Sequence, residues 1–321
     1  MVNVGIIGGA GYTAGELLRI LVWHPTVNIA FVQSTSHAGH PITDVHKDLL
    51  GDTNLVFGEA DYSAVDVIFI CSGHGKTKAF LEQSNLPNDL YIIDLSTDYR
   101  PKNNDGDFVY GLPELNKESI ETASRIANPG CFATCIELGL LPLAEEKQLS
   151  EEIHVNAITG STGAGQNPTV TSHFSWKNNN VAVYKAFTHQ HLAEITESVL
   201  QLQPDYSKAI NFIPVRGNFS RGIMATVYTD CEWSLEEAKE KYQSYYSEHP
   251  FVSISNVIPD VKQVVNTNKC VLYLEKHGDK LMIVSVIDNL LKGASGQAVQ
   301  NMNIMFGLNE KEGLGLKPVG F

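Results

Sequence analysis

The first 130 residues of the chain alternate short apolar runs with polar turns. Predominantly apolar runs occupy 2–7, 28–33, 65–71 and 91–95, and each run has the length of one buried strand. The first run passes through a glycine-rich turn into 16–22, where the apolar spacing indicates a helix. Strands that alternate with helices in this way predict a doubly wound parallel sheet of the α/β class.

Beyond residue 130 the pattern changes. It predicts a helix at 136–144, a strand at 153–159 and a polar helix at 234–247. The stretch 271–288 holds two strand candidates separated by a short polar turn. This mixture of elements predicts a second domain, of the α+β class.

The closing stretch, 288–303, is rich in small residues and predicts a helix that returns to the first domain. We therefore expect the first domain to comprise 1–130 and 290–321, and the second to comprise 131–289. A chain of 321 residues is long enough for two such cores.

Composition narrows the classes of partner. The formal net charge is −13 and the chain has no basic tract, so we exclude nucleic acid and an anionic membrane surface as main partners. Five cysteines, an odd number without a CxxC pair, predict reduced thiols and no zinc or other metal site. No window suits a membrane span and no charged leader opens the chain, so we expect a cytoplasmic protein.

The glycine-rich turn has the pattern G-x-x-G-x-x-x-G, formed by Gly8, Gly11 and Gly15. In strand–turn–helix units, such glycines let the backbone approach a pyrophosphate, which the helix N-terminus then binds. We predict that these glycines, with Tyr12 and Thr13 at the start of the helix, bind a dinucleotide. A tight turn without a ligand is the alternative.

Polar turns after two later strands extend this prediction. Ser34, Ser36 and His37 stand where an acidic residue would bind the ribose hydroxyls of NAD, so the sequence favours NADP. Ser72 and Gly73 follow the next strand, and ligands bind at the carboxyl ends of parallel strands. We expect both groups to face the cofactor, and ordinary polar loops are the alternative.

Cys131 is the first candidate for chemistry. It follows a Pro-Gly break and opens the apolar stretch that is predicted to be a helix. A thiol at a helix N-terminus has a lowered pKa, which makes the nucleophilic thiolate accessible. The alternative is a small, buried apolar residue.

A histidine pair precedes a second helix. His189 and His191 are two residues apart, which is a poor spacing for a shared metal, but either could act as an acid or base. Glu194 lies three residues after His191 and can turn back towards its imidazole, so we prefer His191. Two exposed or capping histidines are the alternative.

Anionic ligands must be met by few cations, because the chain has only five arginines. Arg100 and Arg221 are our candidates for binding a phosphate or carboxylate, with Arg216 behind them. Ser96, in the turn before Arg100, is a further candidate for contact with the substrate. Surface salt bridges are the alternative for the arginines.

Several motifs, in order along the chain, resemble the N-acetyl-γ-glutamyl-phosphate reductase family. They are the loop at 8–15, the segments 94–100 and 110–115, Asn-Pro-Gly-Cys at 128–131, the glycine loop at 163–165, the His-x-His segment 189–195, Arg-Gly-Ile at 221–223, and 288–303. The resemblance implies a Rossmann domain joined to an α+β catalytic domain, as in glyceraldehyde-3-phosphate dehydrogenase. It also implies NADP as cofactor and a homo-oligomer. We further expect 289–303 to pack on the first domain beside the nicotinamide end of the cleft, with Asn289 at the cofactor.

Three segments depart from the family pattern. The turn at 71–75 differs from the usual Leu-Pro-His-Gly, and the loop at 34–37 lacks the arginine often found there. Gln166-Asn167-Pro168 replaces a basic pair after the glycine loop. The first two departures affect contacts with the cofactor, and the third affects contacts with the acyl group.

The resemblance implies NADPH-dependent reduction of an N-acyl-γ-glutamyl phosphate to the semialdehyde through a thioester on Cys131. The alternatives are an enzyme like aspartate-semialdehyde dehydrogenase and a non-catalytic NADP-binding regulatory protein. The sequence leaves open acetyl or succinyl as the acyl group, dimer or tetramer, which histidine is the acid/base, and which arginine binds phosphate.

Overall fold

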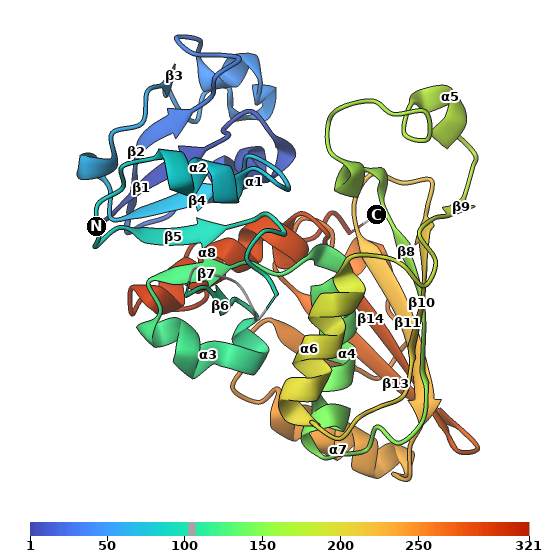
Figure 1. Cartoon of the computed structure of the whole chain (residues 1–321). Helices are drawn as coiled ribbons and strands as arrows, with labels where there is room; N and C mark the ends of the chain where they lie inside the picture. The colour runs from blue at the N-terminus through green and yellow to red at the C-terminus, as the bar shows by residue number, and fades with distance from the viewer. Residues whose placement is uncertain (102–106, 321) are drawn as a thin grey trace. The chain divides into compact units, whose positions relative to one another are not determined.

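The computed structural model describes residues 1–101 and 107–320, which form two compact units (Figure 1). The first unit comprises 1–129 and 294–315, and the second comprises 130–293 and 316–321. The boundaries predicted from the sequence differ at 130, 290–293 and 316–320, which group here with the second unit.

The first unit is built on a seven-stranded sheet in the order β3-β2-β1-β4-β5-β7-β6, and all of its strand pairs are parallel. The strands are β1 (Val2–Ile7), β2 (Val27–Gln33), β3 (Phe57–Gly58), β4 (Val67–Ile70), β5 (Tyr91–Asp94), β6 (Val109–Tyr110) and β7 (Arg125–Ala127). The chain leaves β1 in one direction and returns to its other side at β4, so the predicted doubly wound sheet is confirmed.

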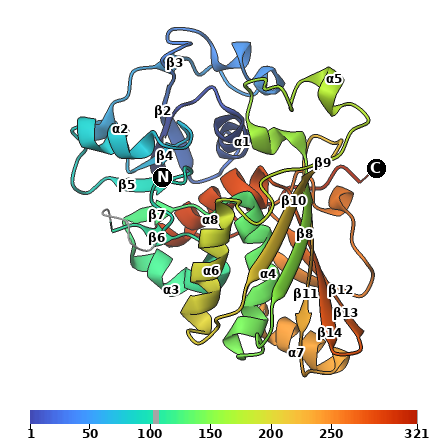
Figure 2. The same ribbon diagram turned by 45° about the vertical axis from the view of Figure 1, so that its right-hand side comes forward.

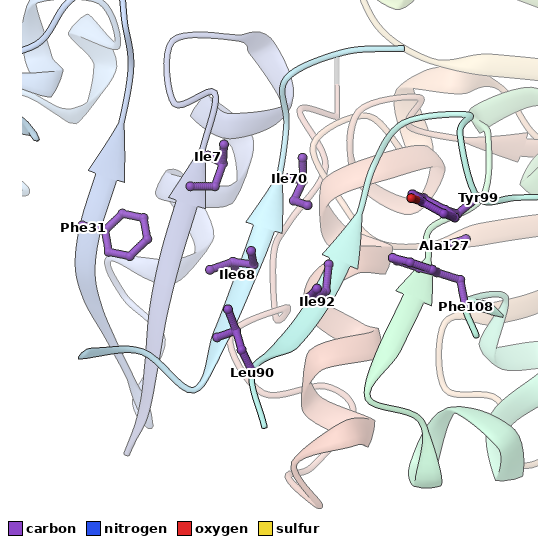
Figure 3. Packing of buried hydrophobic residues seen from close by; sticks show 9 residues of the cluster. All are labelled: Ile7, Phe31, Ile68, Ile70, Leu90, Ile92, Tyr99, Phe108 and Ala127. Atoms are coloured by element: carbon purple, nitrogen blue, oxygen red, sulfur yellow. The ribbon is translucent and has the colours of Figure 1, made fainter. Parts of the chain in front are cut away.

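Helices cover this sheet, and apolar strand residues fill the space beneath them. The helices are α1 (Tyr12–Leu21), α2 (Thr77–Gln83), α3 (Pro113–Thr122) and α8 (Gly296–Met305). Figure 3 shows part of the core, in which Ile7, Ile68, Ile70 and Ile92 come from three adjacent strands. All four residues of β4 are buried, as expected for a central parallel strand with both faces covered.

The second unit contains a mixed sheet of seven strands in the order β12-β13-β14-β11-β8-β10-β9. The strands are β8 (Ile153–Thr159), β9 (Ala182–Val183), β10 (Ile210–Arg216), β11 (Ile223–Asp230), β12 (Val252–Ser255), β13 (Cys270–His277) and β14 (Lys280–Ile287). Two pairs, β8 with β10 and β12 with β13, are parallel, and the others are antiparallel. The predicted α+β class of this domain is confirmed.

Three helices of the second unit pack on one face of its sheet (Figure 2). They are α4 (Cys131–Glu145), α6 (His191–Leu202) and α7 (Leu235–Tyr245), while the short α5 (Phe174–Lys177) lies in the excursion before β9. Along β8 the residues alternate between buried and more exposed positions, which is the pattern of a strand covered on one side. The predicted helix at 136–144 is longer than expected, because it begins at Cys131.

After β14 the chain makes a π-helical turn, Leu291–Ser295, and enters α8 in the first unit. There α8 packs against α1 and α3. Asn301 Nδ2 donates to the carbonyl of Gly111 at 2.8 Å and to Asn128 Oδ1 at 3.1 Å. Through Asn301, α8 is therefore hydrogen-bonded to Asn128, which lies three residues before Cys131.

Candidate active site

The three glycines of the loop after β1 differ in whether the surrounding protein would exclude a side chain. Gly8 has φ +77°, and a Cβ there would lie 2.8 Å from the amide nitrogen of Ser72. A Cβ on Gly15 would lie 2.7 Å from the ring of His46. At Gly11 a Cβ would meet nothing closer than 3.9 Å, so protein packing does not exclude a side chain there.

The start of α1 suits an anion. Gly11 is the N-cap, no side chain caps the helix, and its first turn holds no acidic residue. The N–H groups of the first turn, at Tyr12 and Thr13, therefore point out of an uncapped helix end beside an open glycine. This backbone arrangement is compatible with the pyrophosphate site that the sequence predicts.

The other predicted cofactor residues of the first unit lie at the ends of neighbouring strands. After β2, Ser34 Oγ lies 3.4 Å from Ser36 Oγ, which lies 2.8 Å from His37 Nδ1. After β4, Ser72 packs against Gly8, and Gly73 has φ +90° with open space around it. All of these residues belong to the carboxyl edge of the parallel sheet, where cofactors bind in such folds.

Cys131 is the first residue of α4, with Gly130 as the N-cap. It is partly exposed, whereas Cys135, one turn later, is buried. Burial raises the pKa of the Cys135 thiol far above its usual range, and burial raises that of Cys71 to about 12. Gly293 packs against the other side of the nucleophile, since a Cβ on it would lie 2.7 Å from Cys131 Cβ.

His191 lies directly against the residue before the nucleophile. A Cβ on Gly130 would be only 2.4 Å from His191 Nε2, so only a glycine leaves room for this imidazole. Glu194 Oε2 accepts a hydrogen bond from the Gly130 N–H at 2.8 Å, and its Oε1 lies 3.9 Å from His191 Nε2. One carboxylate thus contacts both the backbone before Cys131 and the candidate acid/base.

His189 has a different role in this cluster. Its Nδ1 accepts a hydrogen bond from the backbone N–H of His191 at 3.2 Å, so the proton of the neutral ring sits on Nε2. Burial, with the charges of Lys185 and Arg216, lowers the pKa of His189 to about 4. The ring packs edge-on against Phe132 and His191, with centroid distances of 5.4 and 4.6 Å.

Two of the predicted substrate residues are occupied by local contacts. Ser96 is 1% exposed, and its hydroxyl donates to Asp94 Oδ2 at 2.7 Å. Arg100 is 6% exposed, and its guanidinium donates to the carbonyls of Asn128 and Leu95 at 2.9 and 3.2 Å. These side chains hold the turn after β5 and the strand end that leads to Cys131.

Arg221 and Asn289 are likewise engaged within the second unit. Arg221 Nε and Nη2 both lie 3.0 Å from Asp288 Oδ2, and the Asp288 carboxylate is fully buried. Asn289 Oδ1 accepts from the Gly222 N–H at 2.7 Å, and its Nδ2 donates to Thr162 Oγ1 at 3.0 Å. Both ends of the Asn289 amide, predicted to contact the cofactor, thus join loops of this unit.

Sequence reasoning missed Tyr184. Its ring lies 5.8 Å from that of His189, and the Arg216 guanidinium lies 4.5 Å from its centroid. Burial, followed by the charge of Cys131, raises the pKa of Tyr184 to about 12. No sequence motif marks this tyrosine, and only the pairing of β9 with β10 brings it to the site.

In the part of the chain that the structure describes, no group of three His, Cys, Asp or Glu side chains could hold a metal ion. Across 1–101 and 107–320, no helix combines the length and the apolar character needed to cross a membrane.

Residues 3–123 match the NAD-binding domain of the semialdehyde dehydrogenases, and 131–289 match their dimerisation domain. An N-acetyl-gamma-glutamyl-phosphate reductase of Parabacteroides distasonis is 60% identical over the full length of both chains. One of Azobacteroides pseudotrichonymphae is 61% identical, again over both full lengths. This chain belongs to the N-acetyl-gamma-glutamyl-phosphate reductase family. Its first unit is therefore a domain for a nicotinamide cofactor.

Among solved structures, aspartate semialdehyde dehydrogenase II of Vibrio cholerae superimposes with a TM-score of 0.75. The match covers 96% of this chain and 98% of the other, at 19% identity. The enzyme of Candida albicans, crystallised with NADP, gives a TM-score of 0.71 at 14% identity, over 95% of this chain and 98% of the other. At such identities the likeness shows a shared fold, and the reductase family shares it with aspartate semialdehyde dehydrogenases.

Proposed function

We propose that the chain reduces an N-acyl-γ-glutamyl phosphate to N-acyl-glutamate 5-semialdehyde and phosphate, with NADPH as reductant, in arginine biosynthesis. The names of the full-length relatives support this substrate class. The observation that carries the proposal is the His191 imidazole against Gly130, next to a cysteine at the first position of α4. An acyl transfer followed by a reduction needs such a nucleophile with a proton donor beside it.

In this mechanism Cys131 Sγ attacks the acyl carbonyl carbon and phosphate departs, which leaves a thioester on Cys131. A nicotinamide cofactor held by the loop after β1 would supply the hydride for reduction of this thioester to a thiohemiacetal. His191 donates a proton to the thiohemiacetal oxygen and takes it back when the C–S bond breaks. The products are the aldehyde and the free Cys131 thiolate, so Cys131 is regenerated in each cycle.

His191 is the acid/base of this proposal, and His189 is a positioning residue. A pKa of about 4 keeps the His189 ring neutral at physiological pH, where it carries no proton to donate as an imidazolium. Its Nδ1 accepts the His191 backbone N–H and so fixes the start of α6. Glu194 supports the same geometry from the other side, through Gly130.

The first turn of α4 is the proposed site for the oxyanion that forms on the carbonyl. No side chain caps this helix, and the Gly130 N–H is already donated to Glu194. The donors for the oxyanion therefore come from the helix after Gly130. One oxyanion donor of this kind lowers the activation free energy by about 3–4 kcal/mol in comparable sites.

We propose NADP as the cofactor, held by Gly8, Gly11, Gly15, Tyr12 and Thr13 at its pyrophosphate. Hydroxyl and imidazole groups of Ser34, Ser36 and His37 would meet the 2′-phosphate, and Ser72 and Gly73 would line the same strand edge. The hydrogen-bonded row from Ser34 to His37 supports this, because it presents donors and no carboxylate. Asn289 is not included, since both ends of its amide are engaged.

A homo-oligomer in the cytoplasm completes the proposal. The match of 131–289 to a dimerisation domain supports association through the second unit. The sheet face opposite to α4 carries Met224, Val271, Tyr273 and Met282, partly buried around Val284. Sedimentation of the purified chain tests this, and a monomer at micromolar concentration would reject it.

The reaction is tested in the oxidative direction, with N-acetyl-L-glutamate 5-semialdehyde, phosphate and NADP. We expect phosphate-dependent formation of NADPH. Faster turnover of L-aspartate 4-semialdehyde would instead support the aspartate-semialdehyde dehydrogenase alternative. NADP binding without turnover of either aldehyde would support a regulatory protein.

A further inference from the structure

The Arg216 guanidinium lies over the ring of Tyr184, near His189, and its Nε is a donor without a hydrogen-bond partner. Its backbone pairs with Ala182 across β9 and β10, which brings the side chain diagonally towards Tyr184. The guanidinium lies 4.5 Å from the centre of that ring, while its Nε is buried without a hydrogen-bond partner. A buried donor without a partner is destabilising, and an acceptor atom on a ligand removes that cost.

Two lysines add positive charge around Arg216. The charge of Arg216 contributes, after burial, to a lowered pKa of Lys177, and Lys185 and Arg216 both lower that of His189. Lys185 Nζ donates to the neutral amide oxygen of Gln190 at 3.1 Å. Among the residues that the structure describes, no carboxylate lies within 4 Å of any of the three cations.

The backbone that carries these side chains is strained. Asn179, Lys185 and Phe187 have φ values of +54°, +46° and +59°, in the left-handed region that favours glycine. Non-glycine residues in this region are energetically unfavourable and cluster at ligand-binding segments. Phe187 is 57% exposed, so burial of its ring does not offset the strain.

We propose that Lys177, Lys185 and Arg216 form a binding site for an oxyanion of the substrate, beside Tyr184 and His189. This rests on the proposed function, in which the substrate carries a carboxylate and a phosphoryl group. The net charge of the chain is −13, yet these three cations have no carboxylate partner, so each of them attracts an anion that enters beside Tyr184 and His189. A guanidinium fork with a free Nε suits a planar carboxylate or a phosphoryl group equally well.

The two anion sources are separated by steady-state kinetics with the aldehyde, phosphate and NADP. The variants are Arg216→Gln and the double variant Lys177→Gln/Lys185→Gln, with Arg216→Lys as the conservative change. Lys241→Gln is the matched control, because Lys241 pairs with Glu146 on the surface of the same unit. Thermal unfolding checks that each variant is folded.

For Arg216→Gln we expect a Michaelis constant raised about 10- to 100-fold, with a smaller change in kcat, because the contact forms before the chemistry. If the rise is for the aldehyde, the site binds a carboxylate; if it is for phosphate, the site binds the phosphoryl group. Partial recovery in Arg216→Lys is expected in either case. Michaelis constants for both ligands that match those of Lys241→Gln would overturn the proposal, and an inactive wild-type chain would instead reject the proposed function.

Discussion

The cofactor loop of the first unit and the nucleophile site of the second are built in opposite ways. The loop is suited to a ligand because side chains are absent from it: Gly11 has none, and no side chain caps the N-terminus of α1. At Cys131, segments that are distant in sequence contact one another: the Glu194 carboxylate accepts the Gly130 N–H, and Gly293 packs against the Cβ of Cys131. The cofactor loop is therefore sensitive to added side-chain volume. The nucleophile site is sensitive instead to the loss of a hydrogen-bond or packing partner.

The largest effect is expected at the nucleophile. Cys131→Ser exchanges an ionisable thiol for a hydroxyl of much higher pKa with little change in shape, so turnover should fall by about 10⁴-fold or more. NADP binding should be unchanged, since the loop after β1 is untouched. Steady-state rates and isothermal titration measure the two quantities.

The control for this variant is Cys231→Ser, a buried cysteine elsewhere in the second unit. It should keep its rate. Residual activity of Cys131→Ser within tenfold of the control would reject covalent catalysis.

Next in size is the ion pair of Arg221. Arg221→Met leaves the fully buried Asp288 carboxylate without its cation, and loss of one partner from such a pair costs about 3–5 kcal/mol. Lys241→Met, which breaks the exposed pair with Glu146, should cost at most about 1 kcal/mol. Urea unfolding of the two variants gives the comparison.

The Arg221–Asp288 ion pair also distinguishes the role of Arg221 from that of Arg216, five positions earlier. Arg221 is committed to Asp288, whereas Arg216 has a buried Nε without a partner. If Arg221→Met proved as stable as the control and instead raised the Michaelis constant for substrate, Arg221 would be the anion-binding residue, as the sequence suggested.

The sequence predicted most of the fold because its signals are local. The apolar runs correspond to β1, β2, β4 and β5, and the glycine turn marks the start of α1. Cys131 and the histidine pair could be found for the same reason, since a Pro-Gly break and a helix entry are short patterns. The thioester role of Cys131 and the acid/base role of His191 remain predictions.

The substrate contacts could not be assigned in this way, because pairing across the fold decides them. No sequence pattern around Arg221 predicts its ion pair with Asp288, which lies 67 positions later. Ser96 looked available, yet its hydroxyl is bonded to Asp94 two positions before it. Tyr184 reaches the site only through the register of a two-residue edge strand.

A smaller effect tests the contrast between glycines of one loop. Gly15→Ala places a Cβ 2.7 Å from the His46 ring and should cost about 1–3 kcal/mol of stability through overpacking. Gly11→Ala meets no protein atom closer than 3.9 Å, so stability should be unchanged while NADP affinity falls about tenfold.

Thermal unfolding without cofactor and fluorescence titration with NADP separate these outcomes. Wild-type affinity in Gly11→Ala would mean that the pyrophosphate does not approach this glycine, and the cofactor site would have to be placed elsewhere in the first unit.

The smallest effect at neutral pH concerns His189, and it appears only on acidification. Burial and the nearby cations lower its pKa from 6.5 to about 4 in the folded protein. Above pH 6.5 the ring is neutral in both states and pH has no effect through it. Between pH 6.5 and 4 the unfolded chain takes up a proton that the folded chain does not, so stability falls.

His189→Asn removes this proton uptake, so its melting temperature should fall less steeply than that of the wild type over the same pH range. His173→Gln, at an exposed histidine of the same unit, is the control and should follow the wild type. Parallel curves for wild type and His189→Asn would show that His189 titrates normally. The ring would then be able to carry a proton near neutral pH, and His189 would again compete with His191 for the role of acid.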